Sequence, residues 1–136
     1  MDRIASFCVD HNKLMPGIYI SRVDDDIVTY DIRMRKPNVP PFLPNEVMHT
    51  IEHLFATFAR NSKFKDNIIY FGPMGCRTGF YFLARNMNNT EAIHLIVDTF
   101  AFIADFSGTV PGTAPEECGN YLEHDLHGAK EEAKNF

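Results

Sequence analysis

The sequence has little that would indicate a secreted or disulfide-bonded protein. It contains three cysteines among 136 residues and no tryptophan. An odd and sparse set of cysteines does not form a disulfide framework. We therefore expect a cytoplasmic protein, in which reduced thiols are free to bind a metal or to take part in chemistry.

Long apolar runs and an excess of basic residues are also missing. Asp98 and Asp105 interrupt the richest apolar stretch, and no apolar signal segment follows Met1. A membrane-spanning helix needs roughly 20 apolar residues. The 13 basic and 18 acidic residues give a net charge of −5 at pH 7, with no basic stripe. We expect neither a membrane nor a nucleic acid as a partner.

The residues that are present suffice for one hydrophobic core. Hydrophobic residues make up 45% of the chain and include 12 phenylalanines. A chain of this length is typical of one domain, and no repeat or linker interrupts it. We predict that residues 1–136 form a single domain.

Short strand-like segments are interspersed with two main helical segments. The clearest strand is Ile27 to Arg35, where apolar and polar side chains alternate and Arg33 lies on the polar face. Further strands are expected at residues 4–9, 17–21, 67–71 and 76–84, with helices at 46–61, 91–106 and from Asp125 to Ala133. Asn45 is expected to cap the first long helix. The short turn at Gly72 to Gly75 suits an antiparallel hairpin, so we predict an α+β fold with an antiparallel sheet packed against a few helices.

The segment from His49 to His53 is the strongest local motif. At about 100° per residue, His49, Glu52 and His53 share one face of a helix. Residues on the opposite face are apolar: Val47, Ile51, Leu54 and Phe58. Histidines four residues apart can chelate one ion, although such a pair also arises by chance on a solvated face. Glu52 favours a metal site, because a carboxylate beside the metal is its usual acid/base partner.

A third metal ligand is needed, because catalytic sites usually combine three protein ligands with an open position. Cys118 is the best candidate, and a thiolate with two imidazoles suits zinc or ferrous iron. The spacing leaves other ligands open, namely His124, His127, Glu116 and Glu117.

Cys76 is the second thiol of interest. It lies between Gly75 and Gly79, where the backbone is closely approachable. The thiol could serve as a general acid/base, or it could be an ordinary buried cysteine in a turn.

Taken together, these segments resemble the S-ribosylhomocysteine lyase (LuxS) family. The matching blocks run in the family's order from residue 6 to about residue 130. They are Ser6-Phe7 with Val9-Asp10-His11, Asp31-Ile32-Arg33 with Lys36-Pro37-Asn38, His49 to Leu54, Pro73 to Tyr81, Cys118-Gly119, and His124-Asp125-Leu126 with Gly128-Ala129-Lys130.

The resemblance implies a role for each matching residue. The metal ligands would be His49, His53 and Cys118, the catalytic acid/base pair Glu52 and Cys76, and the residues that hold the ribosyl part of the substrate Ser6, His11 and Arg33. It also implies one divalent metal per subunit, with Fe(II) as the native ion and zinc or cobalt as substitutes. The implied assembly is a homodimer with its active sites at the subunit interface.

The implied reaction cleaves S-ribosylhomocysteine to homocysteine and 4,5-dihydroxy-2,3-pentanedione, the precursor of autoinducer-2. It proceeds by carbonyl migration and β-elimination. The products link the enzyme to quorum sensing and to the methyl cycle. Tyr70 and Gly72 depart from the family pattern, which usually has aspartate and serine there.

Two other functions fit parts of the pattern. A small metal-dependent hydrolase could use His49, Glu52 and His53 as an inverted zincin-like His-x-x-Glu-His motif. Such an enzyme would have no use for Cys76. A non-catalytic metal-binding domain would close the fourth metal position with another ligand, such as His124.

Overall fold

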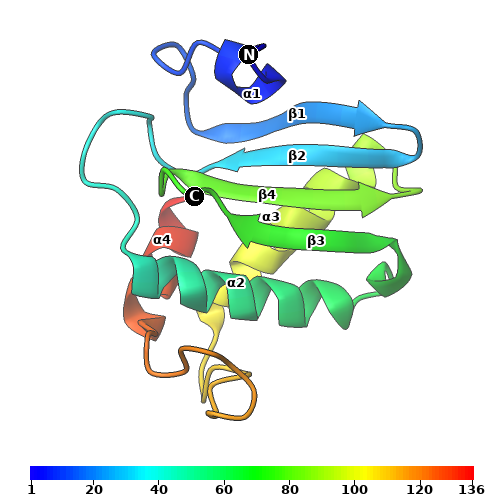
Figure 1. Ribbon diagram of the computed structural model, residues 1–136. Coiled ribbons are helices and arrows are strands. Elements are labelled where there is room, and N and C mark those ends of the chain that lie inside the picture. The colour runs from blue at the N-terminus through cyan, green and yellow to red at the C-terminus, as the bar shows by residue number, and fades with distance from the viewer.

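A four-stranded antiparallel sheet in the order β1-β2-β4-β3 forms the centre of the molecule (Figure 1). The computed structural model describes residues 1–136. Its elements are α1 (Ala5–Cys8), β1 (Gly17–Asp24), β2 (Ile27–Arg33), α2 (Asn45–Arg60), the 3-10 helix η1 (Lys65–Asn67), β3 (Ile68–Pro73), β4 (Gly79–Arg85), α3 (Asn89–Asp105) and α4 (Leu126–Asn135). The predicted α+β class and the β3–β4 hairpin are therefore confirmed.

The core lies between the sheet and the three long helices. In Figure 1, α3 crosses behind the sheet, α2 runs along the β3 side, and no element lies in front of the strands. The core cluster contains 24 buried residues, among them Ile32 from β2 and Phe82 from β4. Phe55 of α2 stacks on Phe71 of β3 with ring centroids 3.7 Å apart. This stacked pair holds the motif-bearing helix against the sheet.

The long helices begin close to their predicted positions, but their caps differ. Pro44, not Asn45, is the N-cap of α2, and no side chain caps this helix. The proline backbone is extended and its carbonyl accepts the first helical hydrogen bond, so Asn45 is already helical. Helix α3 begins two residues early because Asn88 and Glu91 form a capping box. Asp125 caps α4, as predicted. None of the helices combines the length and apolar character needed to cross a membrane.

The N-terminal segment is helical, and the predicted strand at residues 4–9 is wrong. Residues Ala5–Cys8 form α1, and none of its residues is buried. These residues make no sheet pairing, although the outer edge of β1 is free. The short helix pairs some of these groups locally instead, as in the hydrogen bond from Phe7 N to Ile4 O.

The β3–β4 turn lies further along the chain than the glycines suggested. Strand β3 continues to Pro73 and β4 begins at Gly79, so Cys76 lies in the turn and not in the predicted strand. Met74 N donates to Gly79 O across the turn, and Arg77 adopts a positive φ of 61°. Gly79 is required where β4 meets β2, because a Cβ there would lie 2.1 Å from the Ile32 carbonyl oxygen.

Candidate functional site

Four side chains that are distant in sequence meet beside α2. They are His49, His53, Cys118 and His124, and their ligand atoms all lie within 4.8 Å of one another. The Sγ atom of Cys118 lies 3.4 Å from His49 Nε2 and 3.9 Å from His53 Nε2. The long connection between α3 and α4, below α2 in Figure 1, brings Cys118 and His124 to the helix.

Backbone carbonyls orient both helix histidines. His49 Nδ1 lies 2.8 Å from the Glu123 carbonyl oxygen, and His53 Nδ1 lies 2.8 Å from the Pro111 carbonyl oxygen. A carbonyl only accepts, so each Nδ1 donates its proton. In a neutral ring, Nε2 then keeps its lone pair, and both Nε2 atoms are near Cys118 Sγ. This is the outer-shell arrangement that commonly prepares histidines to bind a metal.

His124 adds a third imidazole with a free lone pair. Thr50 Oγ1 donates to the Glu46 carbonyl, so in its 2.9 Å contact with His124 Nδ1 it accepts. His124 Nε2 is then the unprotonated nitrogen, and it is buried without a hydrogen-bond partner. Burial, followed by the charges of His49 and His53, lowers the pKa of His124 to about 4, which keeps the ring neutral at neutral pH.

The donor set fits a transition-metal cation. One sulfur and three imidazole nitrogens can be contributed by the four side chains, and thiolate with imidazole suits zinc or ferrous iron. The orphaned lone pair of His124 Nε2 is costly to bury unless it meets a cation or a proton donor. The other ligands that the sequence left open, His127, Glu116 and Glu117, are not part of the cluster.

Glu52 lies on the same helix face as the two histidines, between two recesses. One recess, of about 310 Å³, is lined by Glu52, His49 and Pro73, among others. The second, of about 260 Å³, is lined by Glu52 with His53 and Gly112. The Glu52 carboxylate makes no hydrogen bond within the chain. It is therefore a free base or acid next to the cluster.

Cys76 belongs to a separate polar network on the other face of the sheet. Its Sγ atom lies 3.1 Å from Thr78 Oγ1 and 3.9 Å from Arg33 Nη1. Arg33 lies on the polar face of β2, as predicted, but it is only 2% exposed. An ion pair with Asp31 and a hydrogen bond to Thr78 compensate for this burial. No hydrogen bond joins Cys76 to the metal-side cluster.

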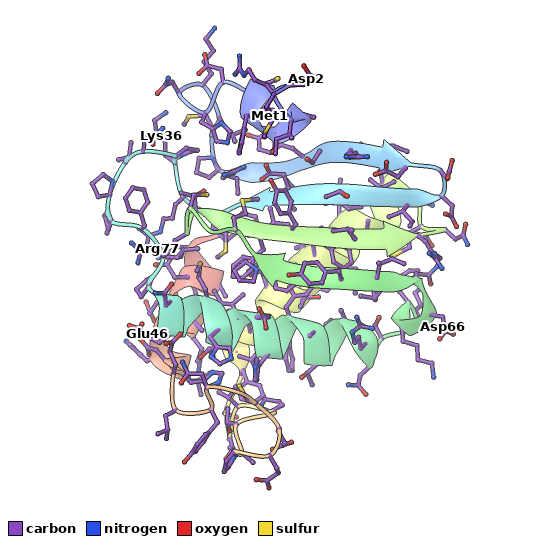
Figure 2. The ribbon with its side chains drawn as sticks, viewed as in Figure 1. Met1, Asp2, Lys36, Glu46, Asp66 and Arg77 are labelled. Carbon is purple, nitrogen blue, oxygen red and sulfur yellow. The ribbon has the colours of Figure 1, made fainter.

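The turn that carries Cys76 nevertheless lies at the cluster's end of the molecule. Pro73, at the end of β3, lines the same recess as His49. Figure 2 places Arg77 of this turn at the same end as Glu46, in the first turn of α2. The structure thus brings the Cys76 turn and the metal-side cluster to one end of α2.

Ser6 and His11 lie apart from the cluster within one chain. They belong to the N-terminal segment, which lies beside β1. The connection that brings Cys118 to the cluster lies beyond α2, past the opposite edge of the sheet (Figure 1). Ser6 is exposed, and His11 Nδ1 contacts only the Val9 carbonyl, at 2.8 Å. One chain alone does not unite all of the candidate residues.

A larger cavity, of about 750 Å³, lies between β1, α3 and α4. It is mainly apolar, with Ile18, Val97 and Phe100 in its wall, and Lys134 is its only ionisable side chain. It lacks the paired acid, base or metal ligands that a catalytic site needs, so the cluster beside α2 is the better candidate.

Comparison with known proteins agrees with this donor set. The family model described as S-Ribosylhomocysteinase (LuxS) matches residues 4–136. The chain belongs to the LuxS family. The S-ribosylhomocysteine lyase of Phocaeicola vulgatus is 48% identical over 142 residues, covering 100% of this chain and 88% of that protein. The enzymes of the same name from Porphyromonas gingivalis and Clostridium beijerinckii are 49% and 45% identical, each with 89% of its length covered.

The LuxS match includes every candidate residue discussed above. It begins at residue 4, before α1, and reaches the end of α4. Ser6 and His11 therefore belong to the LuxS fold although they lie apart from the cluster. The resemblance found in the sequence blocks is confirmed by both kinds of comparison.

Proposed function

We propose that this chain is a metal-dependent carbon–sulfur lyase that cleaves S-ribosylhomocysteine to homocysteine and 4,5-dihydroxy-2,3-pentanedione. The observation that carries the proposal is the set of donor atoms of His49, His53 and Cys118 in a LuxS chain. The names of the close relatives support the substrate and the reaction.

One divalent metal ion per subunit would be held by Nε2 of His49, Nε2 of His53 and Sγ of Cys118. When bound, the ion supplies Lewis acidity that polarises a carbonyl oxygen and stabilises developing negative charge. Fe(II) is the proposed native ion, with zinc or cobalt as substitutes, as the LuxS resemblance implies. One thiolate and two imidazoles suit zinc or ferrous iron.

The protein's own groups would move the protons. After the ribose ring opens, the carbonyl migrates along the sugar chain by enediolate steps, each of which takes a proton from one carbon and returns one to its neighbour. A final proton is removed next to the migrated carbonyl, and the homocysteine thiolate leaves from the adjacent carbon. No water or redox cofactor is consumed. Glu52 and Cys76 are the proposed acid/base pair.

Arg33, Ser6 and His11 would hold the ribosyl part of the substrate. Arg33 is fixed beside Cys76 in the same chain. Ser6 and His11 would come from the partner of a homodimer, since they lie away from the cluster in their own chain. Each active site would then contain residues of both subunits.

Two uncovered surfaces support the homodimer. Because Phe80 and Phe82 point into the core, Tyr81 and Leu83 lie on the opposite face of the sheet, which no element of this chain covers. Helix α1 exposes 67% of Phe7, although the side chain is strongly apolar. A second copy would bury both surfaces at once.

Residues 1–136 would act as one domain in the cytoplasm, where the three free cysteines remain reduced. Homocysteine would return to the methyl cycle, and the dione would provide the autoinducer-2 precursor for quorum sensing.

The test is a turnover assay. The protein is purified without oxygen, loaded with ferrous iron or cobalt, and mixed with S-ribosylhomocysteine, and free thiol is measured. We expect thiol release by the wild type and loss of release in Cys76→Ala. Cys8→Ala, which removes another exposed thiol, serves as the matched control and should keep full activity. A metal-loaded wild type that releases no thiol would overturn the proposal.

A further inference from the structure

Thr78 is a buried hydroxyl-bearing residue whose position is closely restricted. The residue is 1% exposed. Its carbonyl oxygen accepts hydrogen bonds from two successive backbone amides, Met34 N at 2.8 Å and Arg35 N at 2.9 Å. The backbone that carries the hydroxyl is therefore anchored to the end of β2. The position of Thr78 Oγ1 is therefore well defined.

The Thr78 hydroxyl lies between the guanidinium of Arg33 and the sulfur of Cys76. Arg33 Nη1 donates to Thr78 Oγ1 at 2.8 Å, and Cys76 Sγ lies 3.1 Å from the same oxygen. Guanidinium groups only donate, so the Thr78 proton points away from Arg33. Cys76 Sγ is the only acceptor within reach of that proton. Whenever Cys76 is a thiolate, Thr78 must be the donor in this contact.

Arg33 reaches the sulfur mainly through Thr78. The direct distance from Arg33 Nη1 to Cys76 Sγ is 3.9 Å, much longer than either contact of the hydroxyl. Asp31 engages the other two guanidinium nitrogens, with Arg33 Nε donating to Asp31 Oδ1 at 3.1 Å. The ion pair holds Nη1 toward Thr78, and its opposite charges largely cancel.

Tyr81 completes the surroundings of the sulfur. It is paired with Asp31 across the sheet. Burial, followed by the charge of Asp31, raises the pKa of Tyr81, while Arg33 opposes this and Cys76 adds a smaller rise. The Thr78 hydroxyl makes the shorter of the two hydrogen-bonding contacts to the sulfur.

We propose that Thr78 is a positioning residue for Cys76: its hydroxyl donates to the thiolate and links the sulfur to the Arg33–Asp31 pair. Its consequence for turnover rests on the proposed lyase function, but the contact itself does not. As Cys76 takes up a proton, the sulfur no longer requires this donor, and the hydroxyl remains held by Arg33.

The test measures the reactivity of Cys76 without substrate. The metal-loaded protein is treated with iodoacetamide at a single neutral pH, and alkylation of each cysteine peptide is followed by mass spectrometry. Cys8 is an exposed thiol in the same sample and serves as the internal reference. The variants are Thr78→Val, which keeps the shape and removes the hydroxyl, and Thr78→Ser, which keeps the hydroxyl. Thr78→Ala is a second hydroxyl-free variant with a smaller side chain.

The expected result is slower alkylation of Cys76 in both hydroxyl-free variants. Loss of a hydrogen bond to an ionised group reduces the thiolate population by about tenfold. The remaining thiolate is intrinsically more nucleophilic by about threefold, so the net rate falls by about threefold. Thr78→Ser should remain within about twofold of the wild type, and Cys8 should react equally in all variants.

Two results would overturn the inference. One is an unchanged Cys76 rate in a folded Thr78→Val or Thr78→Ala protein. The other is a Thr78→Ser protein that is as slow as Thr78→Val, since this would assign the effect to packing of the methyl group. Because no substrate is used, either result is distinguishable from a failure of the lyase proposal.

Discussion

In each of His49 and His53, the position of the ring proton determines which nitrogen can bind a metal. Carbonyls of Glu123 and Pro111 accept from Nδ1 and leave Nε2 free to face Cys118. The helical spacing of the two histidines was readable from the sequence, but these carbonyls lie in the connection between α3 and α4. Their positions depend on how that irregular segment folds, so no local pattern could have predicted them.

Substitution of His124 tests how the histidines of the cluster are oriented. Its ring stacks on His49 with centroids 4.0 Å apart, and its free Nε2 lies within the cluster. His124→Ala should weaken metal binding by about tenfold, because it removes the ring that stacks on His49 and holds this ligand in its orientation. Competition with a coloured chelator measures the change.

His94→Ala is the matched control for that measurement, since His94 is an exposed histidine on α3 outside the cluster. Equal metal affinity in the His124→Ala and His94→Ala proteins would contradict a role of His124 in orienting His49.

The β3–β4 hairpin shows how an element positions a functional residue. Its register against β2 places Gly79 opposite Arg33, which brings Cys76 and Thr78 to the guanidinium. The glycines around Cys76 predicted a turn, yet the strand boundaries differed from expectation because pairing with β2 determines where β4 begins. Register is a tertiary property, and short glycine-rich segments specify it weakly.

Gly79→Ala tests the close approach of β4 to β2. The new methyl group would lie 2.1 Å from the Ile32 carbonyl oxygen, and neither backbone can move without loss of strand pairing. We expect a loss of about 2–4 kcal/mol in the free energy of unfolding, measured with urea. Gly75→Ala is the control, since nothing lies within 4 Å of its added Cβ. Similar losses for both variants would argue against the steric explanation.

Tyr30 links β2 to α3 and makes stability depend on pH. Its hydroxyl donates to Asn89 Oδ1 at 2.7 Å, and burial raises its pKa above the ordinary value of 10.0. The unfolded chain therefore releases the Tyr30 proton first, and the unfolding free energy falls as pH rises above about 10.

Tyr30→Phe should cost about 1 kcal/mol at neutral pH, where only the hydrogen bond is lost. The difference from the wild type should shrink at about pH 11, because the variant lacks the ionisable group. Urea unfolding at both pH values measures this. A difference that stays constant would show that Tyr30 does not titrate differently in the folded state.

One subunit by itself does not bring all of the candidate site residues together. The N-terminal segment, which carries Ser6 and His11, lies beside β1, while α2 and the connection that carries Cys118 lie past the opposite edge of the sheet (Figure 1). The outer face of the sheet and the apolar side chains of α1 remain uncovered. These features favour a symmetric dimer in which one subunit's N-terminal segment reaches the other's cluster.

Subunit mixing tests this arrangement. His11→Ala and Cys76→Ala proteins should each be inactive as homodimers. After dissociation and reassembly in equal amounts, about half of the dimers contain one chain of each kind. One of the two sites in such a dimer has both native residues, so activity should recover to about a quarter of the wild type. No recovery in verified mixed dimers would mean that the sites are not shared.

Periodicity and short motifs predicted the fold class and the helix that carries His49, Glu52 and His53, because local physical chemistry encodes such patterns directly. The family was indicated by the resemblance of several sequence blocks to known members. Three features became known from the folded chain: His124 joins Cys118 at the cluster, Arg33 is buried against Asp31, and residues 5–8 are helical. Each of these depends on which distant backbone or side-chain groups are available as partners, and that is settled when the chain packs.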